Sequence, residues 1–367
     1  MLTGMSENEA RIGSVAQYSL LGKSGLRVSP FCLGTMTFGT DWGWGAPKET
    51  AHAILDRYVE AGGNFVDTAD GYTSGTSETM IGDWLADRKN RDAVVLATKF
   101  SFSGRMGDPN AGGNGRKNIL RALEGSLKRL RTDYVDLYWL HVWDGITPVD
   151  EVLSTMDALV RSGKVRYFGL SDVPAWYLAR AQTIAELRGL ERVAALQLEY
   201  SLVERNIERE HIPAARELGI GLCPWSPLAS GFLTGKYTRD GVKTAGAGRL
   251  QTIQGSGNPA FEKLFTEKNW TILETLQGVA KELGKKPSEV ALAWIAKRPG
   301  VTSTILGATK LEQLEQNLRA LDVAIPKELQ DRLEAASRPE EIHPYMFFGE
   351  GMRGMITGGT TVRAQPS

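Results

Sequence analysis

The sequence predicts a single (β/α)8 barrel, also called a TIM barrel. Eight short apolar segments alternate with amphipathic segments of helical spacing across residues 17–337. Parallel strands require such helical crossovers, and eight units can close on themselves. No stretch between the units is long enough to separate two domains. The 367 residues, of which 42% are hydrophobic and 23% charged, are sufficient for one large globular domain.

Each unit is predicted from an apolar run, followed by apolar residues spaced three or four positions apart. The turn-rich spacer 22–25 separates two apolar runs and predicts an N-terminal β-hairpin over residues 18–28. The first unit combines a strand at 31–34 with a helix at 48–62. Later strands are expected at 65–67, 93–99, 135–141, 165–171, 194–200, 220–226 and 302–306. The helices that follow them are expected at 76–88, 116–131, 148–162, 174–188, 207–218, 288–297 and 311–320.

A doubly wound open sheet is the alternative fold. It is disfavoured because no Gly-x-Gly-x-x-Gly motif follows the first strand, where such a sheet binds a dinucleotide. A similar run at 255–260 lies in the insertion 229–268, without a preceding strand and with Pro259 inside it. The insertion, the glycine-rich loop 103–115 and the C-terminal tail 338–367 are expected at the C-terminal face of the barrel. The polar residues 1–16 predict a flexible N-terminal tail.

The amino-acid composition indicates which kinds of binding partner and which cellular compartment to expect. Lysine plus arginine and aspartate plus glutamate both total 43, so no net charge favours nucleic acid or an anionic membrane surface. Cys32 and Cys223 lie in apolar runs, which predicts two free thiols in a reducing, cytoplasmic compartment. No apolar run reaches the ~18 residues of a membrane helix, and residues 1–16 lack a leader pattern. We expect a small-molecule substrate and no metal site, and the sequence does not predict an oligomeric state.

Three consecutive predicted strands end in polar residues. Asp67 ends the strand at 65–67, with Tyr72 after it, Lys99 ends the third strand and His141 ends the fourth. A tyrosine, with an unperturbed pKa near ~10, can donate a proton near neutrality if a cation stabilises its phenolate. An Asp67–Lys99 ion pair would supply that cation, and His141 could donate to a carbonyl oxygen. Singly, each has a structural alternative: Asp67 as a turn cap, Tyr72 as a rim residue, Lys99 as a surface lysine and His141 as a core histidine.

Three segments carry a family resemblance. Residues 63–72 (GNFVDTADGY), 133–141 (DYVDLYWLH) and 163–171 (GKVRYFGLS) resemble aldo-keto reductase signatures, and the match covers roughly residues 18–336. The resemblance implies a catalytic tetrad of Asp67, Tyr72, Lys99 and His141, with Tyr72 as general acid. It also implies a nicotinamide cofactor that extends across the barrel mouth. The N-terminal region is most similar to the aryl-alcohol dehydrogenase and potassium-channel β-subunit branches.

The resemblance further implies which residues contact the cofactor. Ser171 and Gln197 resemble the residues that hydrogen-bond the nicotinamide carboxamide, and Trp225 resembles the aromatic residue on which the ring stacks. The segments after the seventh and eighth strands resemble the pyrophosphate loop and the adenosine clamp. Core positions are the alternative for Gln197 and Trp225. The implied cofactor residues are Thr35, Met36, Asp67, Ser171, Asp172, Gln197, Trp225, Ser226, Pro227, Leu228, Gly231, Lys236, Gly307, Thr309, Lys310, Gln313 and Asn317.

Two positions depart from the family pattern. Asp172 stands where relatives commonly carry asparagine, and an ionised carboxylate accepts hydrogen bonds but cannot donate them. Thr309 and Lys310 stand where many relatives carry arginine, so the 2′-phosphate would meet a point charge and a hydroxyl in place of a guanidinium fork. NADPH is expected over NADH.

Three functions are compatible with these residues. The tetrad favours a carbonyl reductase over a β-subunit-like regulatory protein that binds cofactor and turns over little. A Schiff-base aldolase would need a neutral Lys99, which Asp67 opposes. Trp42, Trp44 and the aromatic run 344–348 predict a pocket, with Tyr72 and His141 at its base, for aryl or bulky cyclic carbonyls. Alternatively, the tryptophans pack on a neighbouring loop and the tail docks on the side of the barrel.

Overall fold

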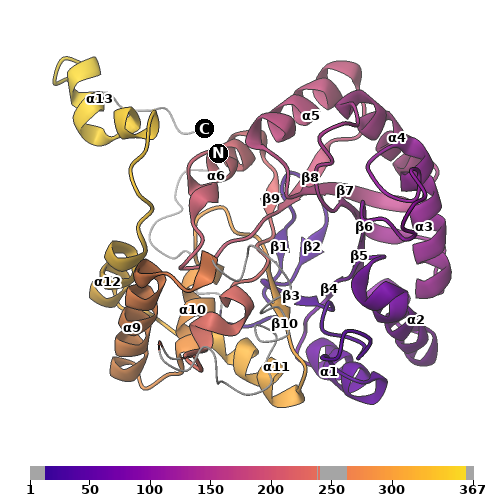
Figure 1. Ribbon diagram of the computed structural model, residues 1–367, viewed down its shortest axis with the longest axis horizontal. Helices are drawn as coiled ribbons and strands as arrows, with labels where there is room; N and C mark the ends of the chain where they lie inside the picture. Colours follow the sequence, from indigo (N-terminus) through magenta and orange to yellow (C-terminus); the bar gives the residue numbers. More distant parts are fainter. Residues whose placement is uncertain (1–12, 238, 240–262, 361–367) are drawn as a thin grey trace, which may run out of the picture.

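The computed structural model describes residues 13–237, 239 and 263–360, and it confirms the (β/α)8 barrel (Figure 1). Within these residues the main sheet has the strand order β10-β3-β4-β5-β6-β7-β8-β9, and every adjacent pair is parallel. The sheet closes because Thr302 N donates to Leu222 O and Ile305 N donates to Pro224 O, both at 2.8 Å. The strands are β3 (Phe31–Gly34), β4 (Phe65–Asp67), β5 (Val95–Phe100), β6 (Val135–Leu140), β7 (Val165–Ser171), β8 (Val193–Gln197), β9 (Gly221–Leu222) and β10 (Thr304–Gly307).

Helices surround the sheet, as the spacing of apolar residues predicts (Figure 1). Because each crossover is helical, the strand ends that carry the predicted site all lie at one end of the barrel. The eight helices that match the prediction are α1 (Lys48–Glu60), α2 (Thr76–Arg88), α3 (Arg116–Leu130), α4 (Val149–Arg161), α5 (Ala175–Arg188), α6 (His211–Leu218), α10 (Pro287–Ala296) and α11 (Leu311–Leu318).

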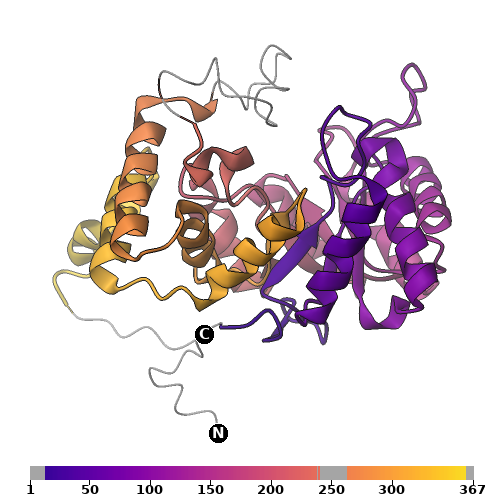
Figure 2. The ribbon, with the colours of Figure 1, turned by 90° about the horizontal axis from the view of Figure 1, so that it is seen from below.

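Two further helices, α9 (Glu267–Glu282) and α12 (Lys327–Ser337), were not predicted, and they pack together beside the barrel (Figures 1 and 2). The N-cap of α9 is Thr266, whose hydroxyl accepts a hydrogen bond from Asn269 N at 3.2 Å. Both helices bury apolar faces, which include Leu273 and Leu276 in α9 and Leu333 in α12. The run 255–260 that resembles a dinucleotide fingerprint lies outside the described residues.

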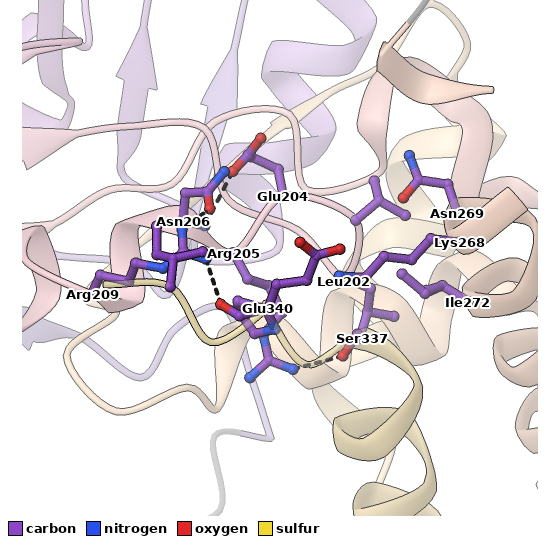
Figure 3. A pocket seen from close by; sticks show the side chains of 13 residues that line it. Leu202, Glu204, Arg205, Asn206, Arg209, Lys268, Asn269, Ile272, Ser337 and Glu340 are labelled. Carbon is purple, nitrogen blue, oxygen red and sulfur yellow. Dashed lines mark hydrogen bonds between the residues drawn. The ribbon is translucent and has the colours of Figure 1, made fainter. Parts of the chain in front are cut away.

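A buried arginine attaches α12 to the segment that follows β8 (Figure 3). Arg205 donates to Ser337 Oγ at 2.6 Å, to Glu334 Oε2 at 2.7 Å and to Glu208 Oε1 at 2.8 Å. A cavity of about 180 Å³ lies beside this cluster, and Figure 3 shows Arg209 reaching the backbone of Glu340 along its edge. The guanidinium groups bordering this cavity are therefore occupied by the protein itself.

The N-terminal hairpin closes the floor of the barrel. Strands β1 (Ser19–Leu20) and β2 (Arg27–Val28) pair antiparallel, and Lys23 N donates to Gly219 O at 2.8 Å, just before β9. Gly22 has a φ of +58°, and a Cβ there would lie 2.7 Å from Ala194 O. Because these residues lie at or just before the starts of β8 (Val193) and β9 (Gly221), the hairpin covers the amino-terminal ends of these strands and leaves the opposite end to the site.

The barrel interior is apolar and filled by side chains. Cys32 and Cys223 are buried and unpaired within it, as predicted. Trp139 occupies the space over Gly169, where an added Cβ would meet the indole ring at 2.3 Å. None of the described helices has the length and apolar composition needed to cross a membrane.

The C-terminal tail leaves α12 along the side of α6. Arg209 donates to Glu340 O at 2.9 Å, and Tyr345 Oη donates to Glu210, the residue before α6. Phe348 is 60% exposed, and the short helix α13 (Glu350–Ile356) stands away from the barrel (Figure 1). In the structure the aromatic run therefore contacts the rim beside α6, and its closure over the mouth remains a prediction.

Candidate active site

The four predicted catalytic residues come from three adjacent strands. Asp67 is the last residue of β4, and Lys99 lies in β5. His141 directly follows β6, and Tyr72 begins a 3-10 turn five residues after Asp67. Since Asp67 pairs with Ala97, and Lys99 pairs with the second-last residue of β6, the side chains meet at the C-terminal end of the barrel.

Lys99 is the centre of this cluster. Its ammonium group donates to Asp67 Oδ2, to Tyr72 Oη at 3.0 Å and to the carbonyl oxygen of Thr68 at 3.0 Å. An ammonium has three donors, and all three are engaged. The side chain is fully buried, which favours the neutral amine, but the charge of Asp67 and the hydrogen bonds to Asp67 and Tyr72 outweigh burial and raise the pKa of Lys99. Lys99 therefore remains a cation beside the phenol oxygen, which opposes Schiff-base chemistry.

His141 is the second tetrad residue that contacts Tyr72. Its ring packs edge-on to Tyr72 at a centroid distance of 5.9 Å, and Phe102 packs edge-on to His141 at 4.8 Å. Burial, and then the positive charge of Lys99, hold the pKa of His141 well below its usual value. No described residue hydrogen-bonds its buried Nδ1. A neutral imidazole has one N–H donor, which suits a hydrogen bond to an uncharged carbonyl oxygen.

Buried hydroxyl groups fix the turn that carries Tyr72. Ser77 Oγ donates to Thr35 O at 2.8 Å and lies 3.0 Å from Thr68 Oγ1, while Thr35 N donates to Asp67 O at 2.9 Å. Thr73 has a φ of +44°, an uncommon conformation for a β-branched residue, and its hydroxyl accepts from Ser77 N at 3.1 Å. The hydroxyl network therefore links this strained turn to the strand end that carries Asp67.

Glu78 supports the same region from behind β5. The side chain is fully buried, accepting a hydrogen bond from Thr98 Oγ1 at 2.5 Å and from Arg129 Nε at 2.6 Å. Asp70 lies nearby, and burial, followed by the charge of Glu78, raises its pKa to about 7. These contacts hold β5 next to the turn and so keep Lys99 within reach of the phenol.

Four of the implied nicotinamide residues lie together beside the tetrad. Gln197 Nε2 donates to Asp67 Oδ1 at 3.1 Å, and Trp225 Nε1 donates to Asp172 Oδ1 at 3.2 Å. Ser171 Oγ is buried and has no hydrogen-bond partner among the described residues. Burial raises the pKa of Asp172 to about 6, although the bond from Trp225 opposes the increase. An unpaired buried hydroxyl at this point fits a cofactor that brings its own polar group.

The loop after β9 turns sharply through residues with positive φ. Ser226, Ser230 and Gly231 have φ values of +55°, +54° and +92°. A Cβ added to Gly231 would lie 3.4 Å from Lys236 Nζ, so this cation lies directly over the loop. Pro227 and Leu228 connect these residues. A compact backbone and a nearby cation are suited to binding a pyrophosphate group.

The implied adenosine residues also converge. Thr309 N and Oγ1 both donate to Gln313 Oε1, at 2.8 and 3.1 Å, and Asn317 Nδ2 donates to Gly307 O at 3.5 Å. Lys310 is the N-cap of α11. Thr35 and Met36, the first two residues after β3, were also expected at the cofactor; the Thr35 hydroxyl donates to Asp67 O at 3.0 Å.

Aromatic side chains lie in two loops next to the tetrad residues Tyr72 and His141. Trp42 and Trp44 pack with a centroid distance of 5.8 Å in a loop that is joined to the Tyr72 turn, because Thr73 Oγ1 donates to Phe38 O at 2.9 Å. Phe102, which is 54% exposed, was not predicted as a site residue. An aromatic residue three positions after Lys99 was the available signal, but nothing in the sequence shows that it turns back onto His141.

Comparisons with known proteins agree with this geometry. The sequence matches the Aldo/keto reductase family over residues 30–338. It is 41% identical to the uncharacterized oxidoreductase YrpG of Bacillus subtilis (strain 168), over 85% of this chain and 93% of that protein. It is 36% identical to the norsolorinic acid reductase stcV of Emericella nidulans, over 83% and 77%. An aryl-alcohol dehydrogenase of Phanerodontia chrysosporium, named for NADP(+), is 34% identical over 89% and 87%. The chain is therefore an oxidoreductase that belongs to the aldo/keto reductase family.

Proposed function

We propose that the protein reduces aldehydes or ketones with NADPH, and that Tyr72 is the general acid. The observation that carries this proposal is the position of Lys99, whose ammonium lies 3.0 Å from Tyr72 Oη and is held there by Asp67. A buried cation at hydrogen-bond distance favours the phenolate that proton donation produces. When an alcohol is oxidised, the same groups catalyse the reverse reaction.

The residues divide the chemistry as follows. The neutral imidazole of His141 donates a hydrogen bond to the carbonyl oxygen and orients it toward Tyr72. When bound, the cofactor supplies a hydride to the carbonyl carbon and becomes oxidised. The Tyr72 hydroxyl gives its proton to the oxygen as negative charge develops there, and Lys99 stabilises the phenolate that remains. An alcohol forms, and Tyr72 regains a proton before the next turnover.

The choice of NADPH is supported by Lys310 and Thr309 at the start of α11, near the converging adenosine residues. A lysine there offers a charge to a 2′-phosphate that NADH lacks. The name of the Phanerodontia chrysosporium relative also specifies NADP(+). Two buried free thiols support a cytoplasmic location.

The substrate class is proposed from the walls of the site. Phe102, Trp42 and Trp44 offer flat apolar surfaces and few hydrogen-bonding groups. Such walls favour aryl or bulky cyclic carbonyls over polar sugars. The names of two relatives, an aryl-alcohol dehydrogenase and a norsolorinic acid reductase, are consistent with an aromatic substrate.

Replacing Tyr72 by phenylalanine tests the proposal. Loss of the hydroxyl should lower kcat for an aryl aldehyde by about 100- to 10,000-fold, the range for a general acid. The Kd for NADPH, measured by fluorescence titration, should stay nearly unchanged. Tyr134→Phe, which removes a hydroxyl bonded to Asp92 away from the tetrad, is the matched control. Normal turnover in Tyr72→Phe, or no turnover of any carbonyl by the native protein, would contradict the proposal.

A further inference from the structure

A cavity lies at the amino-terminal end of the barrel, between the N-terminal hairpin, α5 and the start of β8. Its volume is about 330 Å³, and small-molecule sites typically occupy ~300–1,000 Å³. Lys23 of the hairpin, Gln182 of α5 and Val193, the first residue of β8, are among the residues that line it. Because the tetrad lies at the carboxyl ends of the strands, this cavity is separate from the candidate active site.

Gln182 presents unused hydrogen-bond donors to this cavity. Its side chain is buried, with the residue only 2% exposed, and Oε1 accepts from Val193 N at 3.0 Å. A backbone N–H can only donate, so this contact turns Oε1 toward Val193 and leaves Nε2 for the cavity. No described residue accepts a hydrogen bond from Nε2. A buried amide nitrogen without an acceptor is costly, so the cavity favours an occupant that brings one.

Two cations border the same cavity. The aliphatic stem of Lys23 covers Gly219, where an added Cβ would meet Lys23 Cε at 2.3 Å. The Lys23 ammonium makes no ion pair or hydrogen bond with any described residue. Arg192 lies 3.5 Å from Glu186, but both side chains are exposed, so this pair holds the guanidinium only weakly. Both positive charges are therefore available to a ligand.

The remaining walls are mostly apolar. Leu190 and Val193 pack with the hydrophobic core, and the ring of Tyr167 packs against the interior of the barrel. Tyr167 Oη makes no hydrogen bond with any described residue and adds one more donor. Glu191, which is half-buried, is the only acidic residue among the described residues of the lining. Cations and neutral donors thus outnumber carboxylates.

We propose that this cavity binds a small organic anion. Its carboxylate or phosphate group would lie between Lys23, Arg192 and the amide of Gln182, because charge-assisted donors suit such oxygens. Its apolar part would lie against Tyr167 and Leu190. The site is at the opposite end of the barrel from the tetrad, so the inference does not depend on the proposed function.

Methyl NMR of the full-length protein tests and locates the binding. The methyl signals of Leu190 and Val193 report on the cavity, whereas those of Leu228 report on the loop after β9, at the other end of the barrel. The probes are benzoate, phenyl phosphate and benzamide, which share an aryl ring, and benzamide lacks the charge. At least one anion should shift the cavity signals, and benzamide should bind about 10-fold more weakly or worse. The anion that binds more tightly identifies the preferred head group.

Two substitutions of opposite sign test the charges. Lys23→Met keeps an aliphatic stem but removes the ammonium, so the Kd obtained from the Leu190 signals should rise by about 10-fold or more. Glu191→Gln removes a repulsive charge, so the same Kd should fall by about 3-fold. Lys327→Met removes an exposed lysine of α12 and should leave the Kd unchanged.

Gln182→Glu tests the buried amide. Glutamate can still accept from Val193 N, but it replaces the unused donor by a second carboxylate oxygen, so binding of the anion should be lost. If this variant does not fold, the substitutions at Lys23 and Glu191 decide.

Three results would overturn the proposal. The first is that neither anion shifts the Leu190 and Val193 signals at about 10 mM, well above the ~1 mM Kd of a weak specific site. The second is equal binding of benzamide and the anions. The third is an unchanged Kd in both Lys23→Met and Glu191→Gln.

Discussion

Lys99 and Asp67 illustrate how a single buried contact serves both stability and chemistry. Their side chains are 0% and 2% exposed, so neither charge can turn to water if the other is removed. Lys99→Met should destabilise the protein by about 3–5 kcal/mol, the usual consequence of leaving a buried charge unpaired. The double variant Lys99→Met/Asp67→Asn should recover part of that loss. Urea unfolding of the three proteins measures both effects, and a loss below about 1 kcal/mol in the single variant would show that water reaches Asp67.

Asp172 gives a pH-dependent prediction that needs no cofactor. Its pKa is raised to about 6 in the folded protein, mainly by burial, against ~3.9 in an unfolded chain. The folded state therefore binds this proton more tightly, so the stabilisation is complete below pH ~4 and is lost as the pH rises through about 6.

Asp172→Asn lacks this titration. Its free energy of unfolding should therefore rise relative to that of the native protein by about 1–3 kcal/mol between pH 4 and pH 8. Urea unfolding at several pH values checks the trend. A constant difference across the range would mean that the carboxyl group titrates normally.

Lys310 is expected to favour NADPH over NADH. Lys310→Ala should weaken NADPH binding by about 10-fold or more, the value of one charge-assisted contact, and leave NADH binding nearly unchanged. Lys327→Ala removes an exposed lysine at the start of α12 and serves as the control. Titration with both cofactors separates the outcomes: an equal loss for NADH would place Lys310 against a group that the two cofactors share.

At the scale of elements, the C-terminal segment tests how the substrate pocket is built. Ending the chain at Ser337 keeps the bond from Arg205 to Ser337 but removes the aromatic run and α13. If the run closes over the mouth during turnover, kcat/KM for an aryl aldehyde should fall by about 10-fold while that for a short aliphatic aldehyde changes little. Equal changes for both substrates would mean that the tail only supports the fold.

The elements also show what sequence patterns can and cannot predict. Helices with one apolar face, such as α3 and α4, were predicted to within a residue or two, because their periodicity is strong. The strand expected at 220–226 is only Gly221–Leu222, since Pro224 has no N–H to donate. The helix α9 was not predicted, because it follows the long insertion and precedes no strand.

For the whole molecule, the topology made the tetrad predictable. Once eight parallel strands are expected, the polar residues that end three neighbouring strands must meet, whatever their distance in sequence. The hydroxyl contacts of Ser77 and the packing of Phe102 on His141 were not predictable in this way. They depend on backbone turns with positive φ, at Thr73 and Ser101, that leave no periodic pattern in the sequence.

The barrel also divides its polar groups between two sides. The tetrad is carried by β4, β5 and β6, whereas the candidate cofactor residues, apart from Thr35, Met36 and Asp67, end or follow β7, β8, β9 and β10. In the proposed reduction, the proton donor therefore belongs to one half of the barrel and the hydride donor to the other. A flat carbonyl group held between them with its oxygen toward Tyr72 and His141 presents only one of its two faces to the hydride. The protein should consequently convert an unsymmetrical aryl ketone into a single enantiomer of the alcohol, which chiral chromatography of the product would reveal.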